Sequence, residues 1–241
     1  MLCRPFADNF NIARLLAAST PHSGDWLHAL PLSTCGLRLD NEAVRVAVGL
    51  SLGTSICELH QCPCGKQVDA RGTHGLSCKR GTGRSIRHHE LNDIIYRALT
   101  RASTPSVLEP SGLSGTDGKR PNGLILIPWQ RGKIVTWDVT VTDTVADSYL
   151  HLTSAKAGGA AENADTRKDD KYVDLQQTYT FVTLAFETLG PINVKGVEFL
   201  KELGRRLAAI SDDNRQTFFL FQRISITLQR FNAITFADTF A

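Results

Sequence analysis

The sequence predicts an α/β protein with one mixed sheet, flanked by helices and preceded by a helical segment and a small metal-binding knuckle. Three observations support this prediction. Segments with helical and with strand periodicity alternate through the second half of the chain. Three cysteines and a histidine cluster in a glycine-rich stretch ahead of them. Hydrophobic residues make up 42% of the 241 residues, which is enough for a buried core.

The first 55 residues are predicted to form a helical connecting segment. Apolar side chains at helical spacing indicate one helix over residues 11–18 and a second over residues 41–52. Asp40 or Asn41 is a suitable N-cap for the second helix, because either side chain can accept a hydrogen bond from a free backbone N–H group.

Residues 56–82 are predicted to form a zinc knuckle rather than regular secondary structure. The pattern C-x-C-x9-H-x3-C within CPCGKQVDARGTHGLSC places four candidate ligands, Cys62, Cys64, His74 and Cys78. Thiolates and imidazole are ligands that structural zinc prefers, and four of them complete its tetrahedron. The spacing leaves Cys57 or His60 open as a substitute ligand, and a loop of unligated thiols is the plainer alternative.

Residues 83–241 are predicted to form the main domain, which opens with a basic helix over residues 85–102. Six lysines and arginines face two acids between residues 79 and 101. Phosphate contact is one interpretation of this charge, and a solvated helix face is the other. The candidates for contact with nucleic acid are Arg80, Arg84, Arg87 and His88.

Three strands are predicted next, in the stretches SVLEP, GLILIP and KIVTWDVTVTD. The stretch WQRG between the last two suits a hairpin connection. In the third strand, valines and a tryptophan alternate with threonines and Asp138, so Asp138 is expected on the polar face of the sheet.

The rest of the chain is predicted to add one strand and helices. AGGAAENADTRKDDKYVDLQQ is interpreted as a loop that leads into a helix, which Lys168, Lys171 and Tyr172 would open. YTFVTLAFETLG predicts a buried strand, and two helices follow over residues 196–211 and 216–234. The apolar residues of the last helix are dense enough to predict that it is largely buried.

Three residues of the predicted strands suggest a site for phosphodiester hydrolysis. Glu109 ends the first strand, Asn122 starts the second and Asp138 lies in the third. Such hydrolysis needs carboxylates that converge on Mg²⁺ or Mn²⁺, and a nearby lysine stabilises the developing charge. Asn122 is the exception, because this chemistry favours a carboxylate at that place.

The order of these motifs resembles the C-terminal part of the polyprotein of site-specific non-LTR retrotransposons. The shared stretches include GTHGLSC, RHHELND, LEP, RPN, WDVTVTD and RKDDKY, and the resemblance covers roughly residues 20–190. In that family a reverse transcriptase is followed by a CCHC zinc knuckle and a restriction-like endonuclease of the PD-(D/E)XK superfamily. The resemblance implies a PD-(D/E)XK-like sheet, structural zinc, catalytic Mg²⁺ or Mn²⁺ and nicking of target DNA.

The resemblance also implies roles for individual residues. Cys62, Cys64, His74 and Cys78 match the knuckle, and Arg87 and His88 match an Arg-His element. Glu109 and Asp138 match the magnesium-binding acids, Lys171 and Tyr172 match a downstream Lys/Tyr element, and Asn122 stands where the family has aspartate. Because an amide lacks the negative charge that Mg²⁺ prefers, the implied nuclease is impaired. Deamidation of the Asn122–Gly123 pair would return some of that charge.

The implied partners are target DNA, element RNA and a reverse transcriptase supplied in cis or in trans, which implies an intracellular, nuclear location. The polymerase motif is absent, so the resemblance implies a C-terminal remnant or a truncated copy. No apolar run approaches the roughly 18 residues that span a bilayer, and the N-terminus is a poor signal peptide. Two alternatives stay open: a non-catalytic, zinc-stabilised nucleic-acid-binding module, and an inert element remnant.

Overall fold

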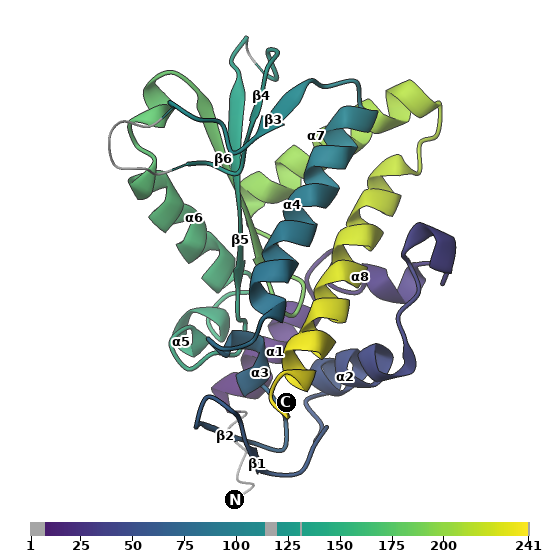
Figure 1. Ribbon diagram of the computed structural model, residues 1–241, viewed down its shortest axis with the longest axis vertical. Helices are drawn as coiled ribbons and strands as arrows, with labels where there is room; N and C mark the ends of the chain where they lie inside the picture. The colour runs from purple at the N-terminus through teal and green to yellow at the C-terminus, as the bar shows by residue number, and fades with distance from the viewer. Residues whose placement is uncertain (1–7, 114–119, 131, 241) are drawn as a thin grey trace, which may run out of the picture.

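In the computed structural model, residues 8–113, 120–130 and 132–240 are described, and they form layers around a four-stranded sheet (Figure 1). Helix α6 (Gly159–Lys171) covers one face of the sheet. Helices α4 (Gly83–Arg101) and α7 (Val194–Ser211) cover the other face, and α8 (Gln216–Ala237) packs against both of them. The predicted mixed α/β fold class is confirmed.

The remaining elements fall into three groups. The N-terminal segment contains α1 (Asn9–Ala18), η1 (Asp25–His28), η2 (Ser33–Cys35) and α2 (Asn41–Leu52). The knuckle contains β1 (His60–Gln61), β2 (Gln67–Val68) and α3 (His74–Ser77). The main sheet is built from β3 (Ser106–Leu108), β4 (Gly123–Ile125), β5 (Val135–Thr142) and β6 (Thr180–Glu187), with α5 (Leu150–Thr153) and η3 (Leu175–Gln177) in its connections.

The main sheet has the strand order β3-β4-β5-β6. Strand β4 is antiparallel to both of its neighbours, β3 and β5, whereas β6 runs parallel to β5 after the crossover through α6. Strand β4 is shorter than the GLILIP stretch predicted, because only three of its residues pair. Gly123 is required in β4, since a Cβ atom there would lie 2.1 Å from the Trp137 ring.

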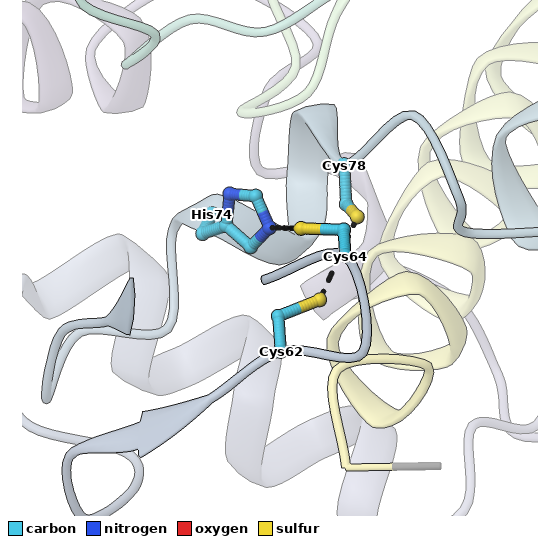
Figure 2. A group of neighbouring side chains, drawn as sticks. All are labelled: Cys62, Cys64, His74 and Cys78. Carbon is cyan, nitrogen blue, oxygen red and sulfur yellow. Dashed lines mark hydrogen bonds between the residues drawn. The ribbon is translucent and has the colours of Figure 1, made fainter. Parts of the chain in front are cut away.

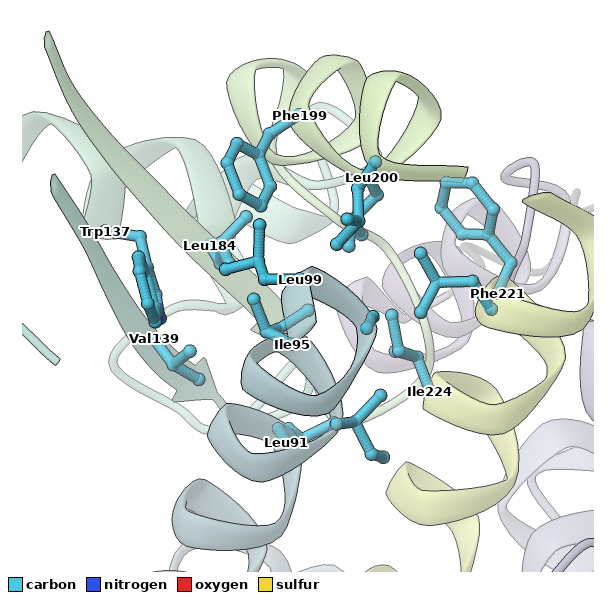
Figure 3. Packing of buried hydrophobic residues seen from close by; sticks show 14 of the residues in the cluster. Leu91, Ile95, Leu99, Trp137, Val139, Leu184, Phe199, Leu200, Phe221 and Ile224 are labelled. Atoms are coloured by element: carbon cyan, nitrogen blue, oxygen red, sulfur yellow. The ribbon is translucent and has the colours of Figure 1, made fainter. Parts of the chain in front are cut away.

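The two faces of the sheet are packed differently. The face toward α4 and α7 carries the main hydrophobic core, in which Trp137 and Val139 of β5 and Leu184 of β6 meet Ile95 and Leu200 from the helices (Figure 3). On the face toward α6, by contrast, alanines of the helix pack against Ala185 of β6. Burial of large apolar side chains therefore stabilises the face toward α4 and α7, whereas the face toward α6 has small side chains and can also accommodate polar groups.

Helix α8 joins the three predicted segments. It packs against α2 and η1 of the N-terminal segment, α3 of the knuckle, and α4 and α7 of the main domain. Phe236 of α8 shares a hydrophobic cluster with Val46 of α2 and Leu76 of α3. The prediction that the last helix is largely buried is confirmed.

Helix α6 corrects one prediction. Residues 159–171 were expected to form a loop, but they form α6. The helix ends at Lys171, where a helix was expected to begin. Only alanines are apolar on its buried face, so the stretch lacks the strong apolar stripe by which a helix is recognised.

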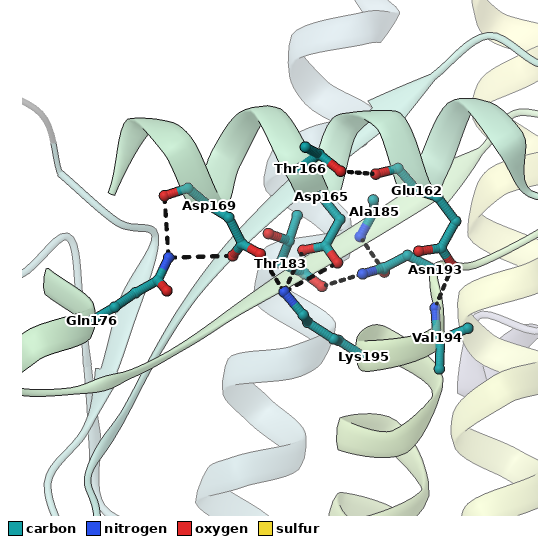
Figure 4. A network of polar contacts seen from close by, with 10 residues as sticks. All are labelled: Glu162, Asp165, Thr166, Asp169, Gln176, Thr183, Ala185, Asn193, Val194 and Lys195. Carbon is teal, nitrogen blue, oxygen red and sulfur yellow. Dashed lines mark hydrogen bonds and ion pairs between the residues drawn. The ribbon is translucent and has the colours of Figure 1, made fainter. Parts of the chain in front are cut away.

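Polar contacts fix α6 at its first turn and along its length. Its first turn is capped by Glu187 of β6, whose Oε1 accepts hydrogen bonds from the N–H groups of Ala160 and Ala161 at 2.9 and 3.1 Å. Further along, Lys195 of α7 forms ion pairs with Asp165 and Asp169 (Figure 4). The position of α6 over the sheet is therefore well defined.

We expect Glu187→Ala to lower the free energy of unfolding by about 2 kcal/mol, because two buried N–H donors lose their acceptor. Urea denaturation followed by circular dichroism measures this change. Glu187→Gln is the matched control, since its amide oxygen can still accept both bonds, and it should cost less than half as much. Equal stability of Glu187→Ala and the unchanged chain would contradict the capping role.

Candidate metal centre and strand-end site

Four candidate metal ligands meet where the β1–β2 turn faces α3 (Figure 2). The sulfur atoms of Cys62 and Cys78 are 3.7 Å apart, and Cys64 Sγ lies 3.2 Å from Nε2 of His74. All four ligand atoms lie within 4.8 Å of one another. In a tetrahedral site with Zn–S bonds of about 2.3 Å, two sulfurs are about 3.8 Å apart. The group could therefore hold a zinc ion.

The protonation chemistry of the four ligands also suits a cation. Burial raises the pKa of the Cys62 thiol to about 11, so its thiolate needs a neighbouring positive charge. The backbone N–H of Lys66 lowers the pKa of Cys64, and burial lowers the pKa of His74, which keeps the imidazole neutral. Zn²⁺ binds thiolates and neutral imidazole, and it supplies the missing charge.

The two substitute ligands take no part in this group. The ring nitrogens of His60 contact the Glu58 carbonyl at 3.0 Å and the Thr239 hydroxyl at 2.9 Å. The Cys57 thiol donates to the carbonyl of Asp69 at 3.3 Å. The spacing of Cys62, Cys64, His74 and Cys78 therefore predicted the ligand group found among the described residues.

The knuckle packs directly against α8. A Cβ atom on Gly75 of α3 would lie 2.8 Å from both the Phe236 Cα atom and the Thr235 carbonyl oxygen. Only glycine allows this approach, so ordering the knuckle also orders the end of α8. The knuckle contains two short strands and a single helical turn, although no regular elements were predicted for it.

The three candidate residues of the strands lie in one row across the sheet. Glu109 directly follows β3, and its N–H donates to the Asn122 carbonyl at 3.0 Å. Gly123 pairs with Trp137 in the β4–β5 register, so one step further places Asn122 opposite Asp138. The carboxylate of Glu109 is exposed, and its backbone is left-handed with φ of 46°.

The Asn122 side chain extends the β4–β5 ladder by one hydrogen bond. Its Oδ1 accepts from the Val139 N–H at 2.6 Å. The carbonyl of Val139 in turn accepts from Nε2 of His88, which reaches it from α4 at 3.1 Å. Burial lowers the pKa of His88 despite the nearby charge of Asp138, so the ring is neutral at pH 7. Asn122 and His88 thus hold the backbone beside Asp138.

Asp138 is buried rather than solvated, because α6 covers the polar face of the sheet. Its side chain is 4% exposed and forms an ion pair with Lys168 of α6. A buried carboxylate is stable only when it is paired, and here the pair joins β5 to α6.

Lys171 and Tyr172 lie beside this site without touching Asp138. The ammonium group of Lys171 donates to the Tyr172 hydroxyl at 3.0 Å, and that hydroxyl donates to the Arg120 carbonyl at 2.8 Å. Tyr172 therefore holds the segment that leads to Asn122. The lysine that contacts the candidate acid is Lys168, one helical turn before Lys171.

A magnesium or manganese site is not supported by the arrangement of the acids. Among the described residues, the cysteine–histidine group is the one place where three or more metal-ligating side chains converge. Glu109 and Asp138 belong to no such group. The catalytic roles of Glu109, Asn122, Asp138, Lys171 and Tyr172 stay predictions.

The four basic candidates for nucleic-acid contact are placed differently from one another. Arg80 and Arg84 are exposed, and they donate to the carbonyls of Pro63 at 2.7 Å and Ser77 at 3.3 Å. His88 is half-buried. Arg87 is 2% exposed and donates to Asn232 of α8, so it holds the interior together instead of facing a ligand. Burial lowers the pKa of Arg87 to about 10, which still leaves it charged.

Sequence reasoning missed Arg167, which lies next to Lys168 on α6 and lines a pocket with Arg84. A helical interpretation of residues 159–171 would have found it, because Lys171 then falls four residues after Arg167 and three after Lys168, which brings it next to both on the helix surface.

Within the described part of the chain, no helix combines the length and the apolar character that crossing a membrane requires. The sequence matches no protein-family model, and no curated protein matches it.

Proposed function

We propose that this chain is a restriction-like DNA endonuclease domain of the retrotransposon type, with a metal site that is impaired by Asn122. One observation carries the proposal. Asn122 and Asp138 stand opposite each other on neighbouring strands, and Lys168 reaches Asp138 from the crossover helix. A disabled metal-dependent phosphodiesterase would retain such a set: one carboxylate, a lysine, and a neutral residue in the place of the second carboxylate.

The order of the elements supports the same proposal. A helix, three antiparallel strands, a crossover helix and a parallel strand follow one another from α4 to β6. This order brings the motifs LEP, RPN and WDVTVTD side by side, although 29 positions separate Glu109 from Asp138 in the numbering. We therefore assign the sheet to the PD-(D/E)XK-like class.

The impairment has two physical causes. Asn122 offers Mg²⁺ a neutral oxygen, which already accepts a hydrogen bond from Val139. The Lys168 ammonium group neutralises Asp138, so a metal ion would have to displace it with the help of one acid fewer. The test is nicking of supercoiled plasmid in Mg²⁺ or Mn²⁺ by the unchanged chain and by Asn122→Asp.

The second candidate function is a non-catalytic, zinc-stabilised nucleic-acid-binding module. The observation in its favour is a groove lined by Lys79, Arg84, His88 and His89, with no acidic residue among its lining. Arg167 and Lys171 continue the positive charge in the neighbouring pocket. Under either function the partner is DNA or element RNA, the reverse transcriptase acts in cis or in trans, and the location is nuclear.

We expect binding to a labelled oligonucleotide to weaken steeply with salt. About four phosphates neutralised by this surface predict a loss of about 100-fold in affinity between about 50 and 200 mM salt. Lys79→Gln should make the salt dependence shallower by about one phosphate contact, whereas Lys201→Gln on the exposed side of α7 should not. Fluorescence anisotropy measures both. Salt-independent binding would contradict the binding-module function.

A further inference from the structure

A cationic pocket lies beside the strand-end site, between α4, the end of β5 and α6. Its volume is about 450 Å³, which falls in the range of ligand-binding pockets. The charged side chains of its lining are Arg84, Arg87, Arg167, Lys168, Lys171 and Asp143.

Two of the five cations are matched by buried acids. Lys168 is paired with Asp138, and buried Arg87 interacts electrostatically with Asp143. Three cations of the lining, Arg84, Arg167 and Lys171, have no acid of their own within it. The pocket therefore has an excess of positive charge that an anion would neutralise.

The two exposed arginines, Arg84 and Arg167, have N–H donors that are not used within the protein's described residues. Among the described residues, Arg84 makes one hydrogen bond of 3.3 Å to the Ser77 carbonyl, and Arg167 makes one of 3.5 Å to the Tyr149 hydroxyl. Both bonds are long, and a guanidinium carries five N–H donors. Most donors on both side chains remain available to a ligand in the pocket.

The helices that present these arginines are held firmly. Arg87, one turn after Arg84, is buried and bonded to Asn232 of α8. Helix α6 is fixed by Glu187 at its first turn and by Lys195 along its length. Two guanidinium groups on fixed helices that line one pocket suit a ligand with several acceptor oxygens, and a phosphate group is such a ligand.

We infer that this pocket is a phosphate-binding subsite, in which Arg84 of α4 and Arg167 of α6 hold one and the same phosphate group. The phosphate is either a backbone phosphodiester or the terminal phosphate of a nucleic-acid strand. The inference rests on the proposed function only for the source of the phosphate, because binding here needs neither Asn122 nor Asp138 to be catalytic.

The test is a double-mutant cycle of binding. Arg84→Gln, Arg167→Gln and the double variant are titrated, zinc-loaded and without added Mg²⁺, against a 3′-fluorescein oligonucleotide that carries either a 5′-phosphate or a 5′-hydroxyl. Arg101→Gln is the matched control, since it lies at the other end of α4 and also makes one long hydrogen bond, 3.4 Å to Gln216. Thermal melting and zinc content verify that every variant is folded.

Each single variant should weaken binding by about tenfold, because charge-assisted hydrogen bonds are lost. The double variant should lose clearly less than the product of the two, because both arginines serve the same phosphate. A loss confined to the 5′-phosphorylated strand identifies a terminal phosphate, and an equal loss with both strands identifies the backbone. Either result supports the subsite.

Binding by both single variants at the affinity of Arg101→Gln would overturn the inference. A double variant that loses the full product would also overturn it, since the arginines would then hold separate phosphates. If Asn122→Asp nicks DNA while the arginine variants bind normally, the subsite alone fails. If the arginine variants lose binding and no variant nicks, the subsite stands and the nuclease proposal fails.

Discussion

Asn122→Asp should nick supercoiled plasmid at least about 100-fold faster than the unchanged chain in Mg²⁺ or Mn²⁺. The new carboxylate would stand opposite Asp138 on the neighbouring strand, so two acids would face a metal ion together. Its second oxygen can still accept the Val139 hydrogen bond that Asn122 accepts now, so the substitution should leave the sheet intact.

A second measurement does not depend on turnover. Two carboxylates that face each other repel, and a divalent cation removes that repulsion. The melting temperature of Asn122→Asp should therefore rise with Mg²⁺ concentration, as expected for a ligand that binds only the folded state. The unchanged chain should show little such gain.

Two controls separate restored catalysis from contamination. Adding Asp138→Ala to Asn122→Asp should remove the nicking, because the metal ion then loses one of its two acids. Adding Lys168→Ala should also remove it, because the lysine displaced from Asp138 can no longer stabilise the charge that develops on the phosphate. Peptide mass mapping of the unchanged chain checks that Asn122 has not deamidated. If the unchanged chain nicks as fast as Asn122→Asp, the proposed impairment is wrong. If no variant nicks although all are folded and zinc-loaded, the binding-module function is favoured instead.

Cys78→Ser should abolish zinc binding and unfold the knuckle. The unchanged chain should bind one zinc ion, and the structural site could contribute on the order of 10 kcal/mol to ordering. Cys78 is buried against Cys62, so its loss leaves three ligands and a poorly matched hydroxyl. Zinc content by mass spectrometry should fall from about one ion per chain to none, and limited proteolysis should cut within residues 56–82.

Two cysteine controls make the zinc prediction specific. Cys35→Ser replaces an exposed thiol of η2, outside the knuckle, and Cys57→Ser replaces a half-buried thiol that packs beside the ligand group. Both variants should keep their zinc, because neither residue belongs to the ligand group. Loss of zinc from Cys57→Ser would show that the ligand set is different. Zinc binding by Cys78→Ser at the affinity of the unchanged chain would contradict the site altogether.

The knuckle could be predicted from sequence because its chemistry is local. Thiolates and imidazole at short spacing need only a few turns to converge, and the glycines between them allow those turns. Helix α2 was predicted with correct bounds for a similar reason, since Asp40 caps it through its own side chain and its apolar stripe is contained in twelve residues. Such features depend little on the rest of the fold.

The partners of the strand-end site could not be predicted, because they come from distant parts of the chain. Helix α6 has alanines where most helices have larger apolar residues, and its cap is Glu187, more than 25 residues after its first turn. Without that helix, nothing in the sequence assigns Lys168 to Asp138. Arg87 is a similar case, since arginine is usually a surface residue and its partner Asn232 lies 145 residues later.

The central place of α8 has a consequence for how this protein is made on the ribosome. The helix is synthesised after α2, α3, α4 and α7, and it packs against all of them. Until residues 216–237 leave the exit tunnel, the apolar surfaces of those earlier helices have no cover from it. The nascent chain should therefore depend on chaperones until α8 emerges, because those apolar surfaces are exposed until then.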